Sequence, residues 1–208
     1  MIGHGRQGCQ LVGHLKTVGM ADDLKRAVAW KSLLINGTDY CALWRTAEGW
    51  LLKGTAVGVL KDQRPMLANY EIHCDDNWLT HRVQVERTIG NDAKTLSLSV
   101  ESRGLWRSAG QELPALRGCL DVDLAVTPAT NTLAIRRLGL GIGKSESVIA
   151  AWVKFPELEI QPLSQRYTRL AQDTYRDESN TGFSAEITVD DLGLVTAYPG
   201  GWERIASR

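Results

Sequence analysis

The chain has 208 residues, of which 43% are hydrophobic, and this is enough for one medium-sized domain with a substantial core. Lysine plus arginine equals aspartate plus glutamate, 24 against 24, and no basic run of five residues occurs, which argues against a nucleic-acid partner. No stretch approaches the ~20 consecutive apolar residues that span a bilayer, so we expect no transmembrane segment.

The first 20 residues resemble a targeting segment only superficially. Their longest apolar run is too short for a signal peptide and is interrupted by His14. Cys9 has no hydrophobic stretch before it, which argues against a lipoprotein anchor. We predict an unstructured extension over residues 1–20, one domain over residues 21–208 and a cytoplasmic location, with Met20 as an alternative start.

Cysteine and histidine spacing gives no sign of a disulfide framework or a metal site. The four cysteines form no C-x-x-C pair, and the four histidines form no H-x-x-x-H pair. We therefore expect reduced, mostly buried thiols and no metal ion or other cofactor.

From Ala27 onward, apolar and polar residues alternate in short segments, as in half-buried strands. The residues predicted to face inward are Tyr70, Ile72, Cys74, Val83, Val85, Leu96, Leu98, Val100, Phe183, Ala185, Ile187 and Val189. Turn-forming breaks fall at residues 47–49, 61–65, 90–92, 177–182 and 190–193. This spacing predicts a dozen or more short strands in a mainly antiparallel sheet.

The segment GCLDVDLAVTPATNTLAIRRL, residues 118–138, departs from this pattern. Its alternation stops at Thr127-Pro128, because proline removes a donor from the strand ladder. Asn131 or Thr132 can then cap a short helix that runs to Leu138 and stops at Gly139. A strand over residues 133–138 is the competing interpretation, and we favour the helix.

Five blocks of sequence together resemble a known family. They are WRTAEGWLLKGTAVG (44–58), NWLTHRVQV (77–85), residues 118–138, AAWVKFPELEIQPLSQRYTRL (150–170) and GLVTAYPGGWERI (193–205). In this order they look like the bacterial glycolipid-binding family, formerly a domain of unknown function. The resemblance covers about Val28 to Ile205, and departs from the family pattern at Ala134, where the family has proline.

The resemblance implies a mainly β fold, a spiral β-roll in which a long antiparallel sheet of about fifteen strands curls around a single helix. It also implies a homodimer. The roll is similar to envelope lipoprotein carriers, and the family's proposed role in glycolipid binding or transport is an analogy at the level of the fold.

Asp121 and Asp123 are the most chemically suggestive pair. At positions i and i+2 of a strand they lie ~6.5–7 Å apart on one face, a separation of the order that glycosidases use. The alternative is that they pair with Arg136, Arg117 or a lysine across the sheet. Arg136 and Arg137 point in different directions in either a strand or a helix, so at most one reaches the aspartates. The other can bind a phosphate or carboxylate, or form a structural ion pair.

Other candidate ligand-binding residues are aromatic or basic. Among seven tryptophans, Trp78 and Trp152 open or centre strong strand patterns and are candidates to line a groove, whereas most of the others are simpler as core. Arg166 and Tyr167 can form a polar pocket entrance or a solvated edge. Arg82, in the second block, completes the candidate set, which contains no catalytic and no metal-ligating residue.

The chain has no nucleophile elbow, phosphate loop or dinucleotide fingerprint. GLGIGKS at residues 139–145 has three rather than four residues between its outer glycines, so it is interpreted as a turn. Three hypotheses remain. The first is non-enzymatic binding of a glycolipid or other amphiphile, with acyl chains on the concave apolar face and the head near arginine or tyrosine. The second is a carbohydrate- or ester-processing enzyme that uses Asp121 and Asp123, and the third is a homodimeric interaction module.

Overall fold

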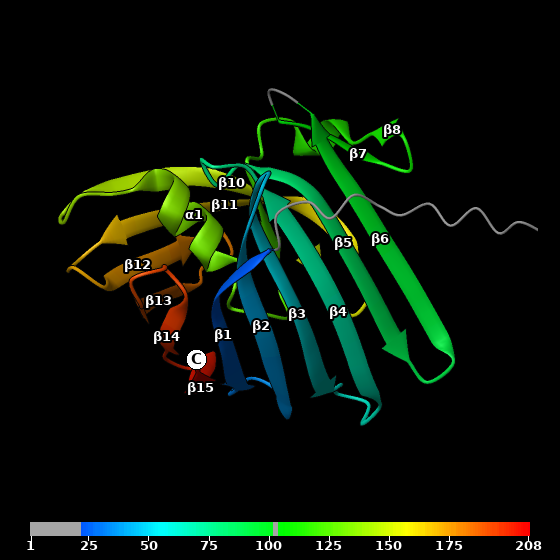
Figure 1. The fold of residues 1–208 in the computed structure, drawn as a ribbon. Coiled ribbons are helices and arrows are strands. Elements are labelled where there is room, and N and C mark those ends of the chain that lie inside the picture. The colour runs from blue at the N-terminus through cyan, green and yellow to red at the C-terminus, as the bar shows by residue number, and fades with distance from the viewer. Residues whose placement is uncertain (1–21, 102–103) are drawn as a thin grey trace, which may run out of the picture.

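A computed structural model describes residues 22–101 and 104–208, in which one continuous sheet of fifteen strands wraps around a short helix (Figure 1). The strands are β1 (Asp23–Ser32), β2 (Gly37–Thr46), β3 (Gly49–Val59), β4 (Pro65–Cys74), β5 (Thr80–Ile89), β6 (Asp92–Glu101), β7 (Leu105–Ser108), β8 (Gln111–Glu112), β9 (Asp121–Leu124), β10 (Ser145–Lys154), β11 (Glu159–Arg169), β12 (Thr174–Ser179), β13 (Ser184–Val189), β14 (Val195–Tyr198) and β15 (Trp202–Ser207). The helices are the 3₁₀ turn η1 (Pro114–Leu116) and α1 (Asn131–Leu138). The predicted spiral β-roll is confirmed, whereas the extension predicted over residues 1–20 lies outside the described residues.

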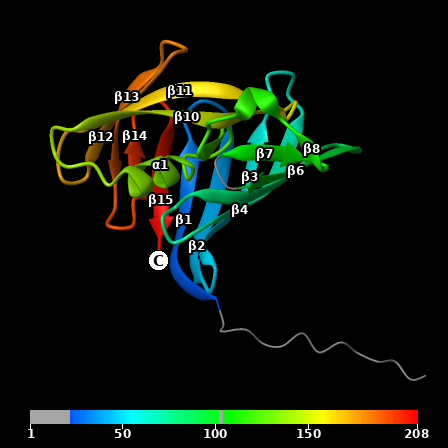
Figure 2. The same ribbon diagram turned by 90° about the horizontal axis from the view of Figure 1, so that it is seen from above.

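The sheet has two arms that meet where β1 pairs with β15. One arm runs from β1 to β8 and the other from β15 back to β9, so that β8 and β9 are the edges. Figure 2 shows from above how the arms curl toward each other. Trp30 joins them, since its indole N–H donates to the carbonyl of Val195 at 2.8 Å. The curl brings β9 against the inner face of β5.

The predicted alternation sets the inner face of the roll. Tyr70, Ile72 and Cys74 of β4 and Val83 and Val85 of β5 are all buried, as predicted. Phe183 was predicted to point inward but is 41% exposed, because β13 begins one residue later, at Ser184. The structure also confirms buried free thiols at Cys41, Cys74 and Cys119, and Cys9 lies outside the described residues.

Helix α1 connects β9 to β10, which pair in parallel while the other neighbours in the sheet are antiparallel. A parallel pair needs a long crossover, and a helix is the usual one. The competing strand over residues 133–138 is therefore excluded. Gly139 ends the helix with a left-handed φ of 52°, as predicted, but the N-cap is Thr130 rather than Asn131 or Thr132. None of the helices in the described residues has the length and apolarity to cross a bilayer.

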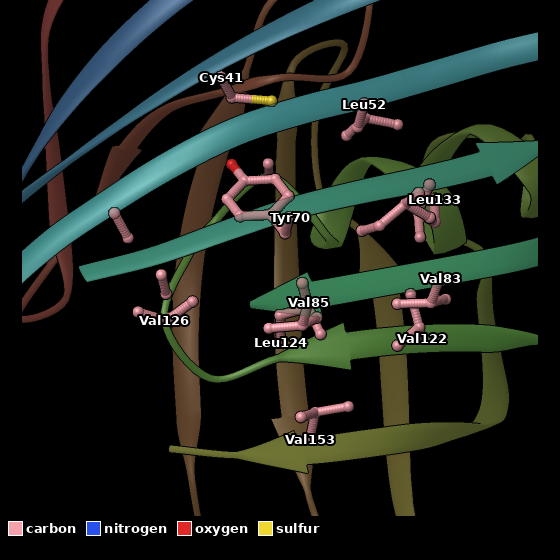
Figure 3. Close-up of a cluster of buried hydrophobic side chains, with 14 of the residues drawn as sticks. Cys41, Leu52, Tyr70, Val83, Val85, Val122, Leu124, Val126, Leu133 and Val153 are labelled. Atoms are coloured by element: carbon pink, nitrogen blue, oxygen red, sulfur yellow. The ribbon is translucent and has the colours of Figure 1, made fainter. Parts of the chain in front are cut away.

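The centre of the roll is filled by side chains of β9 and α1 (Figure 3). Val122 and Leu124 of β9 and Leu133 of α1 join the same buried cluster as Val83 and Val85 of β5. Each of these five residues is at most 1% exposed. The concave face, where we predicted that acyl chains bind, is therefore filled here by the protein's own core. Space for a ligand has to lie elsewhere.

Candidate functional site

Two pockets lie next to each other where several loops between strands gather. The larger, which we name the apolar pocket, has a volume of about 510 Å³. The smaller, the polar pocket, has a volume of about 250 Å³. Leu34, Ala125 and Trp202 line both pockets and so form the boundary between them. Of these two, the apolar pocket falls within the range of ~300–1,000 Å³ that is typical of small-molecule sites, and the polar pocket lies just below it.

The apolar pocket is formed by residues at the ends of β2, β3 and β4 together with two loops of the other arm. Its main apolar lining is Ile35, Val57, Leu60, Met66, Val126 and Phe155. Glycine at position 37, which also lines this pocket, is needed here, because a Cβ atom would lie 2.6 Å from the backbone carbonyl oxygen of Val57. The ionisable groups Lys61, Asp62, Arg64 and Glu157 also line this pocket.

The polar pocket contains two carboxyl groups, from Asp123 of β9 and Asp177 of β12. Asp123 accepts a hydrogen bond from Nε2 of Gln165 at 2.9 Å. Burial nevertheless raises the pKa of Asp123 to about 6, against the opposing effect of its hydrogen bonds. The side chain remains partly open to the pocket, so it can bind a group that enters.

Asp177 is more deeply buried, at 2% exposure, and its Oδ1 atom has no hydrogen-bond partner among residues 22–101 and 104–208. Burial raises its pKa to about 7, and the negative charges of Asp123 and Glu178 add to the shift. A buried polar atom without a partner is costly unless something satisfies it. This oxygen is therefore the strongest indication of a ligand contact in the pocket.

Amide and aromatic side chains complete the polar pocket. Asn131 of α1 lines it, and its Oδ1 atom accepts a hydrogen bond from the hydroxyl of Tyr167 at 2.9 Å. Trp152, Phe183 and Tyr198 add aromatic surface. No lysine or arginine of the described chain lines this pocket. Carboxyl, amide and aromatic groups without a cation suit a head group rich in hydroxyls better than a phosphate.

Three of the nine predicted ligand-binding residues lie at this pocket. Asp123 and Trp152 line it, and Tyr167 orients Asn131 from behind. Lys154 lies over the ring of Trp152, 4.9 Å from its centroid, and so covers part of the aromatic surface.

Asp121 and Arg137 form an ion pair instead of contributing to the pockets. Nε of Arg137 donates to Oδ1 of Asp121 at 2.9 Å, and Nη2 donates to the other carboxylate oxygen. Asp121 is 2% exposed, so the pair is nearly buried. The aspartate's partner is thus neither Arg136 nor Arg117, and only one of the adjacent arginines reaches it because α1 turns the other away.

Arg136 and Trp78 belong to a stack on the other side of α1. The guanidinium carbon of Arg136 lies 5.6 Å from the centroid of the Trp78 ring, which stacks on Trp50 at 4.5 Å. Trp78 is 5% exposed and lines neither pocket. Arg82 and Arg166 are exposed and donate to Gln84 and Ser145, respectively, also outside both pockets.

Sequence reasoning missed Asp177, Gln165 and Asn131. Asp177 falls in DESNTG, which we interpreted as a turn over residues 177–182. In the structure β12 continues to Ser179, and Asp177 pairs with Tyr167 on one side and Ala185 on the other. A usable signal was alternation: in TYRDES, Tyr175 and Asp177 share a face, and Tyr175 is buried.

Comparison with known proteins gives one family and one solved structure. A family model described as "Putative glycolipid-binding" matches residues 27–204. The crystal structure of a DUF1089 family protein from Pseudomonas aeruginosa is 31% identical in sequence, with a TM-score of 0.74. The similarity covers 80% of this chain and 92% of that one. No curated protein matches the chain.

Proposed function

Because the chain belongs to the family described as "Putative glycolipid-binding", we propose that it binds an amphiphile, such as a glycolipid, whose head group is uncharged and rich in hydroxyls. The acyl chain occupies the apolar pocket and the head occupies the polar pocket. One observation carries this proposal: the two pockets share Leu34, Ala125 and Trp202 as lining, so a ligand can place its two unlike ends in adjacent compartments.

The polar lining favours a sugar over a phosphate. Asp123 and Asp177 carry negative charge when ionised, and no lysine or arginine of the described residues lines the polar pocket to offset a phosphate. Hydroxyl groups can donate to the partly exposed carboxyl group of Asp123, and Asp177 lines the same pocket. Of the expected positions near arginine or tyrosine, this proposal keeps tyrosine, since Tyr198 lines the polar pocket and Arg136 and Arg137 are engaged elsewhere.

The test compares two detergents with the same dodecyl chain below their micelle concentrations, dodecyl glucoside and dodecyl phosphocholine. Binding is followed by calorimetry and by the fluorescence of Trp152 and Trp202, which line the pockets. We expect the glucoside to bind more tightly. Equal binding of both detergents, or binding of neither, contradicts the proposal.

Two variants locate the site. Asp177→Asn should weaken the glucoside by about 10-fold or more, since a hydrogen bond to a charged group contributes ~1.5–3 kcal/mol. Glu178→Gln is the matched control, because Glu178 is the next residue of β12 and lines neither pocket. Ala125→Trp should block the boundary between the pockets and weaken both detergents.

A second candidate, hydrolysis of a glycoside, is favoured by one observation. Asp123 and Asp177 line the same pocket, and their pKa values are raised to about 6 and about 7. One carboxyl group can then be protonated while the other is ionised, as acid–base catalysis of glycoside cleavage requires. The pair predicted from the sequence, Asp121 with Asp123, is less suited because Arg137 holds Asp121. A panel of aryl glycosides assayed between pH 5 and 7 tests this, and turnover that survives Asp177→Asn contradicts it.

Homodimer formation and a cytoplasmic location belong to the same proposal. The family resemblance supports the first. Light scattering of the purified chain and fractionation of source cells measure them independently of ligand binding.

A further inference from the structure

Leu33, Leu34 and Ile35 form an exposed apolar turn between β1 and β2, which we name the Leu33–Ile35 tip. Their exposed fractions are 50%, 70% and 37%. The hydroxyl of Ser32 accepts hydrogen bonds from the backbone N–H groups of Leu34 and Ile35 at 3.2 and 3.3 Å. Turns are usually polar, so an ordered turn that holds neighbouring apolar side chains in water needs an explanation.

The tip lies at the boundary between the two pockets. Leu34 lines both of them, and it is the most exposed large hydrophobic residue of the described chain. The backbone N–H of Leu33 donates to the carbonyl of Gly201 at 2.8 Å. Gly201 lines the polar pocket, so this bond fixes the tip relative to that pocket.

We propose that the Leu33–Ile35 tip docks the protein on a lipid bilayer, with Leu33 and Leu34 in the interface and the pockets facing the membrane. The inference rests on the proposed amphiphile binding, because a bilayer is where such a ligand resides. Docking by the tip places the boundary between the pockets against the lipid surface, so a lipid can enter without crossing bulk water.

The size of the tip favours a bilayer over a protein partner. Its three side chains expose on the order of 300 Å², well below the ~800 Å² per partner of a stable protein interface. A few apolar side chains are sufficient for reversible insertion into the boundary between head groups and acyl chains.

The charges beside the tip fit a zwitterionic surface. Lys61 and Arg64 balance Asp62 and Glu157 in the lining of the apolar pocket, and Arg64 pairs with Asp62 at 2.7 Å. With no net charge there, insertion depends on apolar area rather than on attraction to anionic lipid. Binding should therefore change little with salt or with the fraction of anionic lipid.

The experiment is flotation of the full chain with phosphatidylcholine vesicles. Leu33→Glu is the test variant, because Leu33 lines neither pocket and should leave ligand binding intact. Ile142→Glu is the matched control, since Ile142 is 62% exposed in the turn before β10 and lines neither pocket. We expect Leu33→Glu to reduce the bound fraction by about tenfold and Ile142→Glu to change it by less than about twofold.

Binding of dodecyl glucoside by the same proteins separates this inference from the proposed function. Normal glucoside binding with vesicle binding lost in Leu33→Glu supports docking by the tip. Glucoside binding without any flotation of the wild type, or equal flotation of Leu33→Glu, overturns docking alone. Flotation without glucoside binding overturns the proposed function alone. If light scattering shows that Leu33→Glu converts a dimer to a monomer, the tip is a protein interface and docking is wrong.

Discussion

Asp39 in the closed centre of the roll and Asp177 in the polar pocket are similar acids in opposite surroundings. They are 1% and 2% exposed, and burial raises the pKa of each to about 7. Asp39 receives hydrogen bonds from the hydroxyl of Tyr70, at 3.1 and 3.2 Å to its two oxygens, and from the hydroxyl of Thr127. Asp177 instead lines a pocket, and its Oδ1 atom has no hydrogen-bond partner in the described part of the chain.

The difference shows that a raised pKa does not by itself identify a functional site. Burial produces the shift in both places, and what distinguishes them is whether the protein satisfies the carboxyl group. The Asp39 network is complete and holds β2, β4 and the loop before α1 together. The carboxyl group of Asp177 has an unpaired oxygen atom, and this is the reason we propose a ligand there.

The largest expected effect is on the ion pair between Asp121 and Arg137, which is nearly buried and contributes to neither pocket. Arg137→Met should lower the free energy of unfolding by about 3–5 kcal/mol, because it leaves a nearly buried carboxylate without its partner. Arg136→Met is the control, and it should cost less than about 1 kcal/mol, since Arg136 is exposed and contacts the ring of Trp78 and the carbonyl of Asp191. Urea unfolding at pH 7 measures both, and equal losses would contradict the separation of the two arginines.

The second prediction concerns the dependence of stability on pH. The folded pKa values of Asp39, Asp123 and Asp177 lie above the ordinary value of 3.8, so the folded state holds these protons more tightly. The free energy of unfolding should therefore fall as pH rises from about 4 to about 7, and level off above that. The ionisable groups that face Asp177 are Asp123, Tyr167, Tyr198 and Glu178.

Asp177→Asn isolates the contribution of the pocket to that curve. It should stabilise the protein at pH 8 by on the order of 1–3 kcal/mol, because the variant no longer buries an unpaired charge. The curve between pH 4 and 7 should be flatter than that of the wild type or of Glu178→Gln. Thermal or urea unfolding at several pH values measures this, and an unchanged slope would show that Asp177 is adequately solvated.

The sequence predicted much of the closed centre. Strict alternation gave the inward residues of β4 and β5, and the loss of alternation followed by Gly139 gave α1. These features depend on short-range patterns that a strand or a helix imposes on neighbouring residues.

The polar pocket was less predictable because it depends on pairing between distant strands. Asp123 and Trp152 were among the predicted residues, but Asp177 stands in a run of turn-forming residues, and its pairing with Tyr167 of β11 and Ala185 of β13 keeps it in a strand. The partner of Asp121 was missed for a similar reason. Which adjacent arginine faces β9 is set by how α1 is rotated, and the spacing of residues does not determine that rotation.

The third prediction tests the closed network with Tyr70→Phe. Removing this hydroxyl takes a donor from Asp39, and the loss of unfolding free energy should be about 1–3 kcal/mol. Affinity for dodecyl glucoside should stay within about twofold of the wild type, because neither Tyr70 nor Asp39 lines the apolar or the polar pocket and Thr127, which lines the polar pocket, keeps its hydrogen bond to Asp39. A strong loss of affinity without a loss of stability would mean that the centre of the roll takes part in binding.

The smallest and most discriminating effect is expected from Tyr167→Phe. Tyr167 is as buried as Tyr70, at 2% against 1%, but its hydroxyl donates to Asn131, which lines the polar pocket. The variant should lose only about 0.5–1.5 kcal/mol of unfolding free energy, the usual net value of one neutral hydrogen bond. Asn131 keeps its bond to the carbonyl of Pro128 but loses the bond that holds its Oδ1 atom, so its amide is less firmly oriented and glucoside affinity should fall by about three- to tenfold. The two variants thus each remove one phenolic hydroxyl from a buried ring. Calorimetry should show the loss of affinity in Tyr167→Phe and the larger loss of stability in Tyr70→Phe. If Tyr70→Phe instead lost the affinity and Tyr167→Phe the stability, the ligand site would lie at the centre of the roll rather than in the polar pocket.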